Sequence, residues 1–175
     1  MADPSVAPPA TRTSWNTQPP GPMAAFDYGA TFSAAEYDII CRGLIPVEME
    51  DKWFVFLEAH TLYFHRSWTG HCVYQLEFQP TPTRHEVVRA LVASDDDMYH
   101  RSSDLYEAAL VDFLIRGLLL HQRVAFPIPA SLVSAPAGIF QHHIAGSGFP
   151  ERVFGSPRRS HLDTFRHLFK LLKKF

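Results

Sequence analysis

The sequence has few cysteines, little net charge and no long uninterrupted apolar run, and each shortage excludes a class of protein. Two cysteines, Cys41 and Cys72, are too few for a disulfide framework, which fits a reducing compartment. A formal net charge of −2 gives no field that would gather nucleic acid or acidic lipid, so we expect no nucleic-acid partner. The most apolar run, residues 108–120, contains Asp112 and Arg116 and is too short to span a bilayer, so no transmembrane segment is predicted.

A secretory signal is not expected either, because the first residues lack a charged region followed by an apolar stretch. By elimination, the sequence predicts a cytoplasmic location. Apolar residues are abundant, at 46% of the chain with 13% aromatic, and this composition indicates a folded core. A length of 175 residues suits one ordinary domain.

The N-terminal residues have a composition that differs from the rest of the chain. Residues 1–30 contain six of the fourteen prolines among Ala, Thr and Ser. Such a segment cannot bury enough apolar surface to offset the entropy lost on ordering. We therefore predict a disordered Pro-rich tail over residues 1–30, with Trp15 in solvent, and a single domain over residues 31–175.

The domain is predicted to begin with a short helix and an antiparallel sheet. Ser33 and Glu36 form a capping box at the start of the helix, and Gly43 is well placed to end it. Four runs rich in Val, Phe, Tyr and Leu follow, and their short connections require an antiparallel meander. These strand-like runs are residues 52–58, 61–66, 71–78 and 85–92.

Two helical segments and an irregular segment complete the predicted fold. A long apolar helix over residues 103–120 is expected to be buried on more than one side. Five prolines with scattered glycines predict an irregular arm over residues 124–157, followed by an amphipathic helix over residues 158–175. The basic residues of that helix suit a membrane surface or nucleic acid, but its apolar stripe favours docking on the sheet. The predicted class is α+β: a four-stranded antiparallel meander with a short helix before it, a long apolar helix after it and a C-terminal amphipathic helix.

The register of the meander determines which side chains meet. A two-residue turn at residues 59–60 and a four-residue loop at residues 67–70 would place Trp53 opposite Arg66 and His65 opposite both Phe54 and Cys72. The same register would put a large apolar patch on one face, which must be covered by the C-terminal helix, the arm or a second subunit. The patch would consist of Phe54, Phe56, Tyr63, Tyr74, Leu76 and Phe78.

Polar and aromatic side chains are concentrated at one hairpin tip, over residues 50–71. A guanidinium beside an ammonium, hydroxyls and loop amides suits a small anionic ligand, so we predict a binding site there. The alternative is an architectural lock, in which Arg66 stacks on an indole and pairs with Glu50 or Asp51. The predicted ligand-binding residues are Lys52, Trp53, His65, Arg66, Ser67, Trp68 and Thr69.

Three functional hypotheses follow from this tip. The first is a non-catalytic binding module for an anionic group. The second is a hydrolase-type enzyme on phosphorylated or ADP-ribosylated substrates, with His65 or His71 as acid or base and Glu50, Asp51 or Glu58 orienting it. The third is an interaction protein that uses the apolar sheet face to bind a protein partner or a second copy.

A metal or cofactor is not predicted. His65 and Cys72 offer two possible metal ligands, and the adjacent pair His142 and His143 could add more, but no spacing fixes a set of four.

Two motifs at the tip also carry a resemblance. Glu-Asp-Lys-Trp-Phe at residues 50–54 and Phe-His-Arg-Ser-Trp-Thr-Gly at residues 64–70 resemble a family of small, mostly bacterial proteins of unknown function. The resemblance runs from about Ile45 to Leu120. It implies no catalytic role for any residue, and it associates the chain with ADP-ribose-handling genes, hence with a nucleotide phosphate or ADP-ribose-like group.

Overall fold

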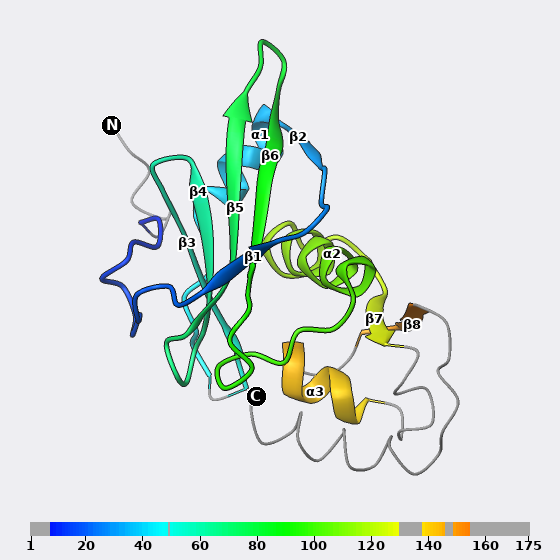
Figure 1. Cartoon of the computed structure of the whole chain (residues 1–175). Coiled ribbons are helices and arrows are strands. Elements are labelled where there is room, and N and C mark those ends of the chain that lie inside the picture. The colour runs from blue at the N-terminus through cyan, green and yellow to red at the C-terminus, as the bar shows by residue number, and fades with distance from the viewer. Residues whose placement is uncertain (1–7, 49, 130–137, 146–148, 155–175) are drawn as a thin grey trace.

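The computed structural model describes residues 8–48, 50–129, 138–145 and 149–154. The fold class is α+β, with an antiparallel sheet packed against helices (Figure 1). Within the described ranges, no helix has the length and apolar character needed to cross a membrane.

The main sheet has six strands instead of the four predicted. Its order is β1-β6-β5-β4-β3, and β2 pairs with a second stretch of β6. The four consecutive strands β3 to β6 form the predicted meander, and the two short N-terminal strands extend it. The strands are β1 Met23–Ala25, β2 Thr31–Ser33, β3 Trp53–Glu58, β4 Thr61–Arg66, β5 Cys72–Pro80 and β6 Arg84–Ala93.

Residues 8–30 do not form the predicted tail. Strand β1 lies within them, and Phe26 enters the main core with 7% of its surface exposed. Residues 8–20 lie on the side of β3 and β4 that faces away from α2 (Figure 1). The segment docks through a few anchor residues and main-chain hydrogen bonds, and a proline-rich composition does not reveal such contacts. Residues 1–7 lie outside the described part of the chain.

The hairpin between β3 and β4 has the predicted register. Ala59 and His60 form the two-residue turn with φ angles of 46° and 66°, a positive-φ pair that suits the strand twist although neither residue favours it. Trp53 pairs with Arg66, and His65 pairs with both Phe54 and Cys72, as predicted.

The register changes one residue further along β5. Phe64 pairs with Tyr74, so Val73 is an extra residue in a β-bulge. The bulge corrects the predicted patch, because Tyr74, Leu76 and Phe78 join the main core with Phe64 instead of lying beside Phe54.

The predicted starts of the first two helices are confirmed, but the predicted length of the second helix is not. The capping box of Ser33 and Glu36 begins α1, Ala34–Ile40, and Gly43 follows with a φ of 68°. Ser103 caps α2, Asp104–Phe113, but the predicted long helix changes to a π-helical segment, η1, over Leu114–Leu119. The predicted single long helix is therefore corrected to two shorter segments.

The predicted irregular arm contains regular structure in its described residues. Strand β7, Phe126–Pro129, pairs in parallel with β8, Glu151–Phe154, and the short helix α3, Ile139–Ala145, lies between them in the chain. The predicted C-terminal helix lies outside the described residues.

The sheet separates two cores of unequal size. The main core joins the sheet to α2, η1 and α3 and includes fully buried Trp53, Phe64 and Leu110. On the other face, Phe54 and Phe56 are fully buried beneath the N-terminal segment. The predicted cover by the chain's C-terminal helix is therefore supplied, over this part of the sheet, by residues that precede the first helix.

Candidate functional site

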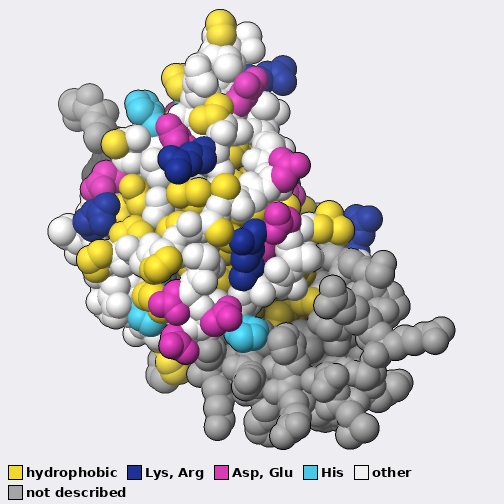
Figure 2. Space-filling view, viewed as in Figure 1, with side chains coloured by type: hydrophobic (Ala, Val, Ile, Leu, Met, Phe, Trp, Pro, Cys, Tyr) yellow, Lys and Arg dark blue, Asp and Glu magenta, His cyan; other side chains and the backbone are white. Residues whose placement is uncertain are grey.

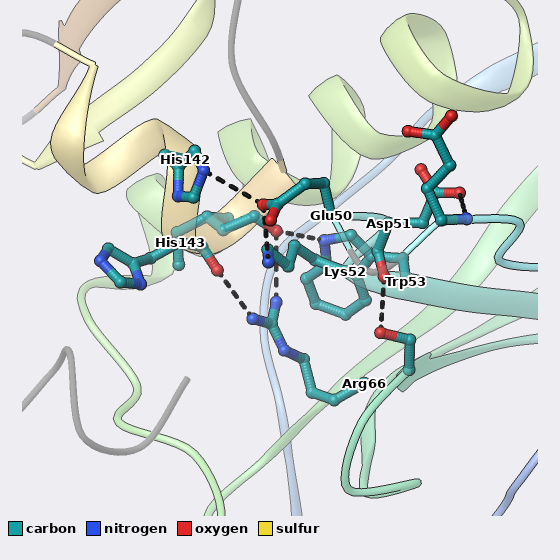
Figure 3. A network of polar contacts seen from close by, with 10 residues as sticks. Glu50, Asp51, Lys52, Trp53, Arg66, His142 and His143 are labelled. Carbon is teal, nitrogen blue, oxygen red and sulfur yellow. Dashed lines mark hydrogen bonds and ion pairs between the residues drawn. The ribbon is translucent and has the colours of Figure 1, made fainter.

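Arg66 occupies the end of β4 and caps the last turn of α3. Its side chain is buried, and its two terminal nitrogens donate to the carbonyl oxygens of His143 at 2.9 Å and Ile144 at 3.2 Å (Figure 3). The last carbonyls of a helix lack partners within the helix and carry partial negative charge, so a guanidinium satisfies both needs. Burial lowers the pKa of Arg66 to about 10, which leaves it protonated at neutral pH.

Trp53 supports the same contact from the neighbouring strand. Its indole Nε1 donates to the carbonyl of Ile144 at 2.6 Å, and its ring lies 4.7 Å from the guanidinium carbon of Arg66. The architectural alternative therefore holds for the stack, but the partners of Arg66 are main-chain carbonyls and not the predicted Glu50 or Asp51. A guanidinium with both ends bonded to α3 is poorly placed to receive a ligand.

The loop after β4 is fixed by main-chain contacts. Ser67 Oγ donates to the carbonyl of Asp51 at 2.6 Å, and the indole Nε1 of Trp15 donates to the carbonyl of Ser67 at 2.8 Å. Gly70 has a φ of 75°, and a side chain there would press on Asn16 of the N-terminal segment. Thr69 accepts a hydrogen bond from a main-chain amide of the same loop. Ser67 and Thr69 thus hold the loop together in this structure.

The exposed carboxylate of Glu50 lies between the basic side chains of Lys52 and His142. Glu50 Oε2 is 3.2 Å from Lys52 Nζ and 3.1 Å from His142 Nε2 (Figure 3). The Lys52 side chain is only 11% exposed, whereas those of Glu50 and His142 are 59% and 49% exposed. Lys52 Nζ also lies 5.1 Å from the ring centre of Trp68, whose side chain is largely exposed.

Basic groups outnumber acidic ones at this position. Burial lowers the pKa of His143, and the neighbouring charges of His142, Lys52 and Arg66 lower it further, whereas Glu50 raises it. Two cations, Lys52 and Arg66, and two imidazoles, His142 and His143, therefore lie around the one carboxylate of Glu50. Chemically, such an arrangement can accept an additional or replacement anion.

His65 does not belong to this cluster, although it was predicted there. It points to the opposite face of the sheet, where it is fully buried, stacks on Phe56 and bonds through Nδ1 to the carbonyl of Gly70 at 2.8 Å. Burial lowers its pKa. The predicted group of seven residues is thus divided between the two faces by the strand alternation of β4.

The three acids proposed to orient a catalytic histidine have other partners. Glu50 meets His142 and Lys52, Asp51 accepts the main-chain amides of residues 47 and 48, and Glu58 pairs with Arg12. Among the described contacts, these acids form no His–carboxylate pair with His65 or His71, and the histidine that Glu50 meets is His142.

A second polar group lies in the main core. Glu107 of α2 is fully buried, and its Oε2 accepts hydrogen bonds from the hydroxyls of Tyr74 and Tyr99, the latter at 2.8 Å. Its Oε1 accepts the amide of Ser102 at 2.6 Å. Burial raises the pKa of Glu107, while these hydrogen bonds lower it. The hydrogen bond between Glu107 and Tyr74 therefore joins α2 to strand β5 of the sheet.

Sequence reasoning missed the role of His142 at the candidate site. It considered His142 and His143 only as incomplete metal ligands, within an arm expected to be irregular. Helix α3 brings both histidines to the hairpin tip, which lies more than seventy residues earlier in the sequence. A local sequence pattern cannot predict such a long-range contact. Within the described ranges, His, Cys, Asp and Glu side chains form no group of three or more that could hold a metal ion.

Comparison with known proteins gives no match: no family model fits the sequence, and no curated protein or solved structure is significantly similar to it. The motif resemblance of residues 50–70 stays a prediction.

Proposed function

We propose that the chain is a non-catalytic binding module for a small anionic group, which binds between Lys52 and His142 where the Glu50 carboxylate lies. The observation that carries the proposal is the unequal burial of this ion pair. Lys52 is largely removed from water, but its carboxylate partner is exposed on the surface. A Lys side chain that is mostly buried favours an anionic partner for its charge, and an exposed carboxylate side chain is readily displaced.

Arg66 contributes to this proposal through its charge and not through direct contact. Its donors are bonded to α3, so the bidentate recognition predicted from the sequence is replaced by a point charge from Lys52 and an imidazole donor from His142. Trp68 adds an exposed ring beside Lys52. Anions with an attached planar group, such as nucleotide phosphates, are therefore suitable ligands to test beside simple phosphate.

The other two hypotheses receive less support. The enzyme hypothesis named His65 or His71 as the base, but Glu50, Asp51 and Glu58 pair instead with His142, main-chain amides and Arg12. The interaction hypothesis requires an open apolar sheet face, but residues near Ala10 cover Phe54 and Phe56. A binding role needs neither an oriented base nor an open apolar face.

The proposal is tested by calorimetric titration with inorganic phosphate and a nucleoside monophosphate at constant ionic strength. Lys52→Ala should weaken binding roughly tenfold or more, because it removes a charged hydrogen-bond donor. Arg84→Ala is the matched control, since Arg84 is an exposed cation on β6 far along the sheet from the tip. Equal affinity in Lys52→Ala and wild type would contradict the proposed site.

A further inference from the structure

The N-terminal segment lies on the sheet like a strap over a buried histidine. The strap, residues 8–18, is attached by main-chain bonds from Ala10 to Arg42 at 2.8 Å and from Gln18 to Gly70 at 2.8 Å. Between these ends, Arg12 lies 5.4 Å from the ring centres of both Phe56 and Tyr63 and pairs with Glu58. Ala10 is the strap's one fully buried residue; its other residues are exposed or half-buried.

His65 lies under the strap with one nitrogen unsatisfied. Its Nδ1 is 2.8 Å from the carbonyl of Gly70, which accepts but cannot donate, so the neutral ring carries its proton on Nδ1. Nε2 is buried and has no hydrogen-bond partner among the described residues. The closed position of His65 is stable only while Nε2 remains unprotonated, because a buried N–H without an acceptor is costly and a buried charge is more costly still.

The surroundings of His65 do not favour a positive charge. Aromatic rings of Phe54, Phe56 and Tyr63 lie 6.3, 5.5 and 6.4 Å from its ring. The charged and titratable groups that face it are Arg12 from the strap, Tyr63 on its own strand and Cys72 on β5, with Glu58 of β3 beyond Arg12. The nearest charge is thus a cation, while the Glu58 carboxylate is engaged with that cation.

We propose that residues 8–18 form a releasable strap, and that protonation of His65 releases it and exposes the aromatic face of Phe54, Phe56 and Tyr63. Release hydrates the imidazolium, separates it from Arg12 and removes only one fully buried strap side chain from the core. This proposal does not rest on the anion site, since His65 lies on the opposite face of the sheet, although Trp15 of the strap also bonds to Ser67 in the loop that carries Trp68.

The direction of the pH dependence follows from the histidine. Burial, and then the charge of Arg12, lower the pKa of His65 from its ordinary value of 6.5, against the raising effect of Gly70. Above pH 6.5, His65 is neutral in both the closed and the released states, so the strap is fully closed. Below it the released state takes up a proton first, and the closed state loses stability by up to tenfold per pH unit until its own pKa is reached.

Amide hydrogen exchange in the full chain tests the proposal. The protection factor of the Gln18 amide should fall roughly tenfold between pH 7.5 and pH 5.5, while that of Phe26, bonded to Ala90 in the main core, stays constant. His65→Asn keeps a donor near Gly70 without a titrating ring, so its Gln18 protection should not change over this range. A pH-independent Gln18 amide in the wild type, or the same fall in His65→Asn, overturns the proposal.

A second measurement covers the case in which His65→Asn fails to fold. In the wild type, the imidazole resonances of His65 and the indole N–H resonance of Trp15, which is bonded to Ser67, should change with the same pH midpoint. Titration of His65 without any change at Trp15 would show that the strap stays in place.

Discussion

At the scale of single residues, Arg66 shows how a residue type suited to ligands can serve the fold. A planar guanidinium at a hairpin tip indicates anion recognition from sequence, but here it bonds to two carbonyls at the end of α3. The residue type and its position were predictable. The partner was not, because it comes from a helix that begins seventy-three residues later.

Replacing Arg66 tests this structural role. Arg66→Lys should lower the free energy of unfolding by about 2 kcal/mol or more, because one ammonium cannot bond both carbonyls in the buried geometry. Urea denaturation measures the change, and Arg84→Lys on the exposed end of β6 should shift it by less than about 0.5 kcal/mol. A stable Arg66→Lys protein that loses anion binding would restore Arg66 as the receptor.

Glu107 makes a second residue-scale prediction, on pH. Burial raises its pKa above the ordinary value of 4.5, so the folded state holds the proton more tightly than the unfolded state. Its contribution to stability is therefore complete below pH 4.5 and is lost as pH rises through the folded pKa.

Glu107→Gln removes this titration. The difference in the free energy of unfolding between wild type and Glu107→Gln should therefore shift against the wild type as pH rises from 4 to 8, measured by urea denaturation at each pH. A difference that stays constant over this range would show that Glu107 has the same pKa in both states.

At the scale of elements, the sequence predicted what is local and missed what is distant. The capping box of α1, the four strands of the meander and the β3–β4 register all follow from adjacent residues. The bulge at Val73 was not predictable from alternation, because one extra residue leaves the apolar pattern of β5 intact while moving Tyr74 to the other face. Helix α3 and strand β1 depend on partners far along the chain.

The N-terminal segment provides the element-scale prediction. Deleting residues 1–20 should lower the melting midpoint by several degrees, because it uncovers Phe54 and Phe56, and burial of one such side chain is worth about 1.5–3 kcal/mol. Deleting residues 1–7 is the control, since it leaves every described contact of Ala10 and Arg12 in place. Equal melting midpoints for all three proteins would return residues 8–20 to the flexible tail predicted from composition.

At the scale of the whole molecule, charge is dispersed and function must be local. Figure 2 shows acidic and basic side chains interspersed on the face drawn, in keeping with a formal net charge of −2. A ligand would therefore be attracted by the basic cluster near Lys52 and not by the field of the protein as a whole. The sequence predicted this end of the sheet as the site, but the proposed pair, Lys52 and His142, comes together only when α3 is packed.

The central claim is that Glu50 occupies the position of an external anion. Glu50→Gln keeps the size of the side chain but removes its charge, so Lys52 and His142 lose their internal partner. We expect phosphate to bind at least about fivefold more tightly to Glu50→Gln than to wild type in calorimetric titration, with Glu48→Gln, an exposed acid of the same segment, unchanged. Unchanged or weaker binding by Glu50→Gln would contradict the account.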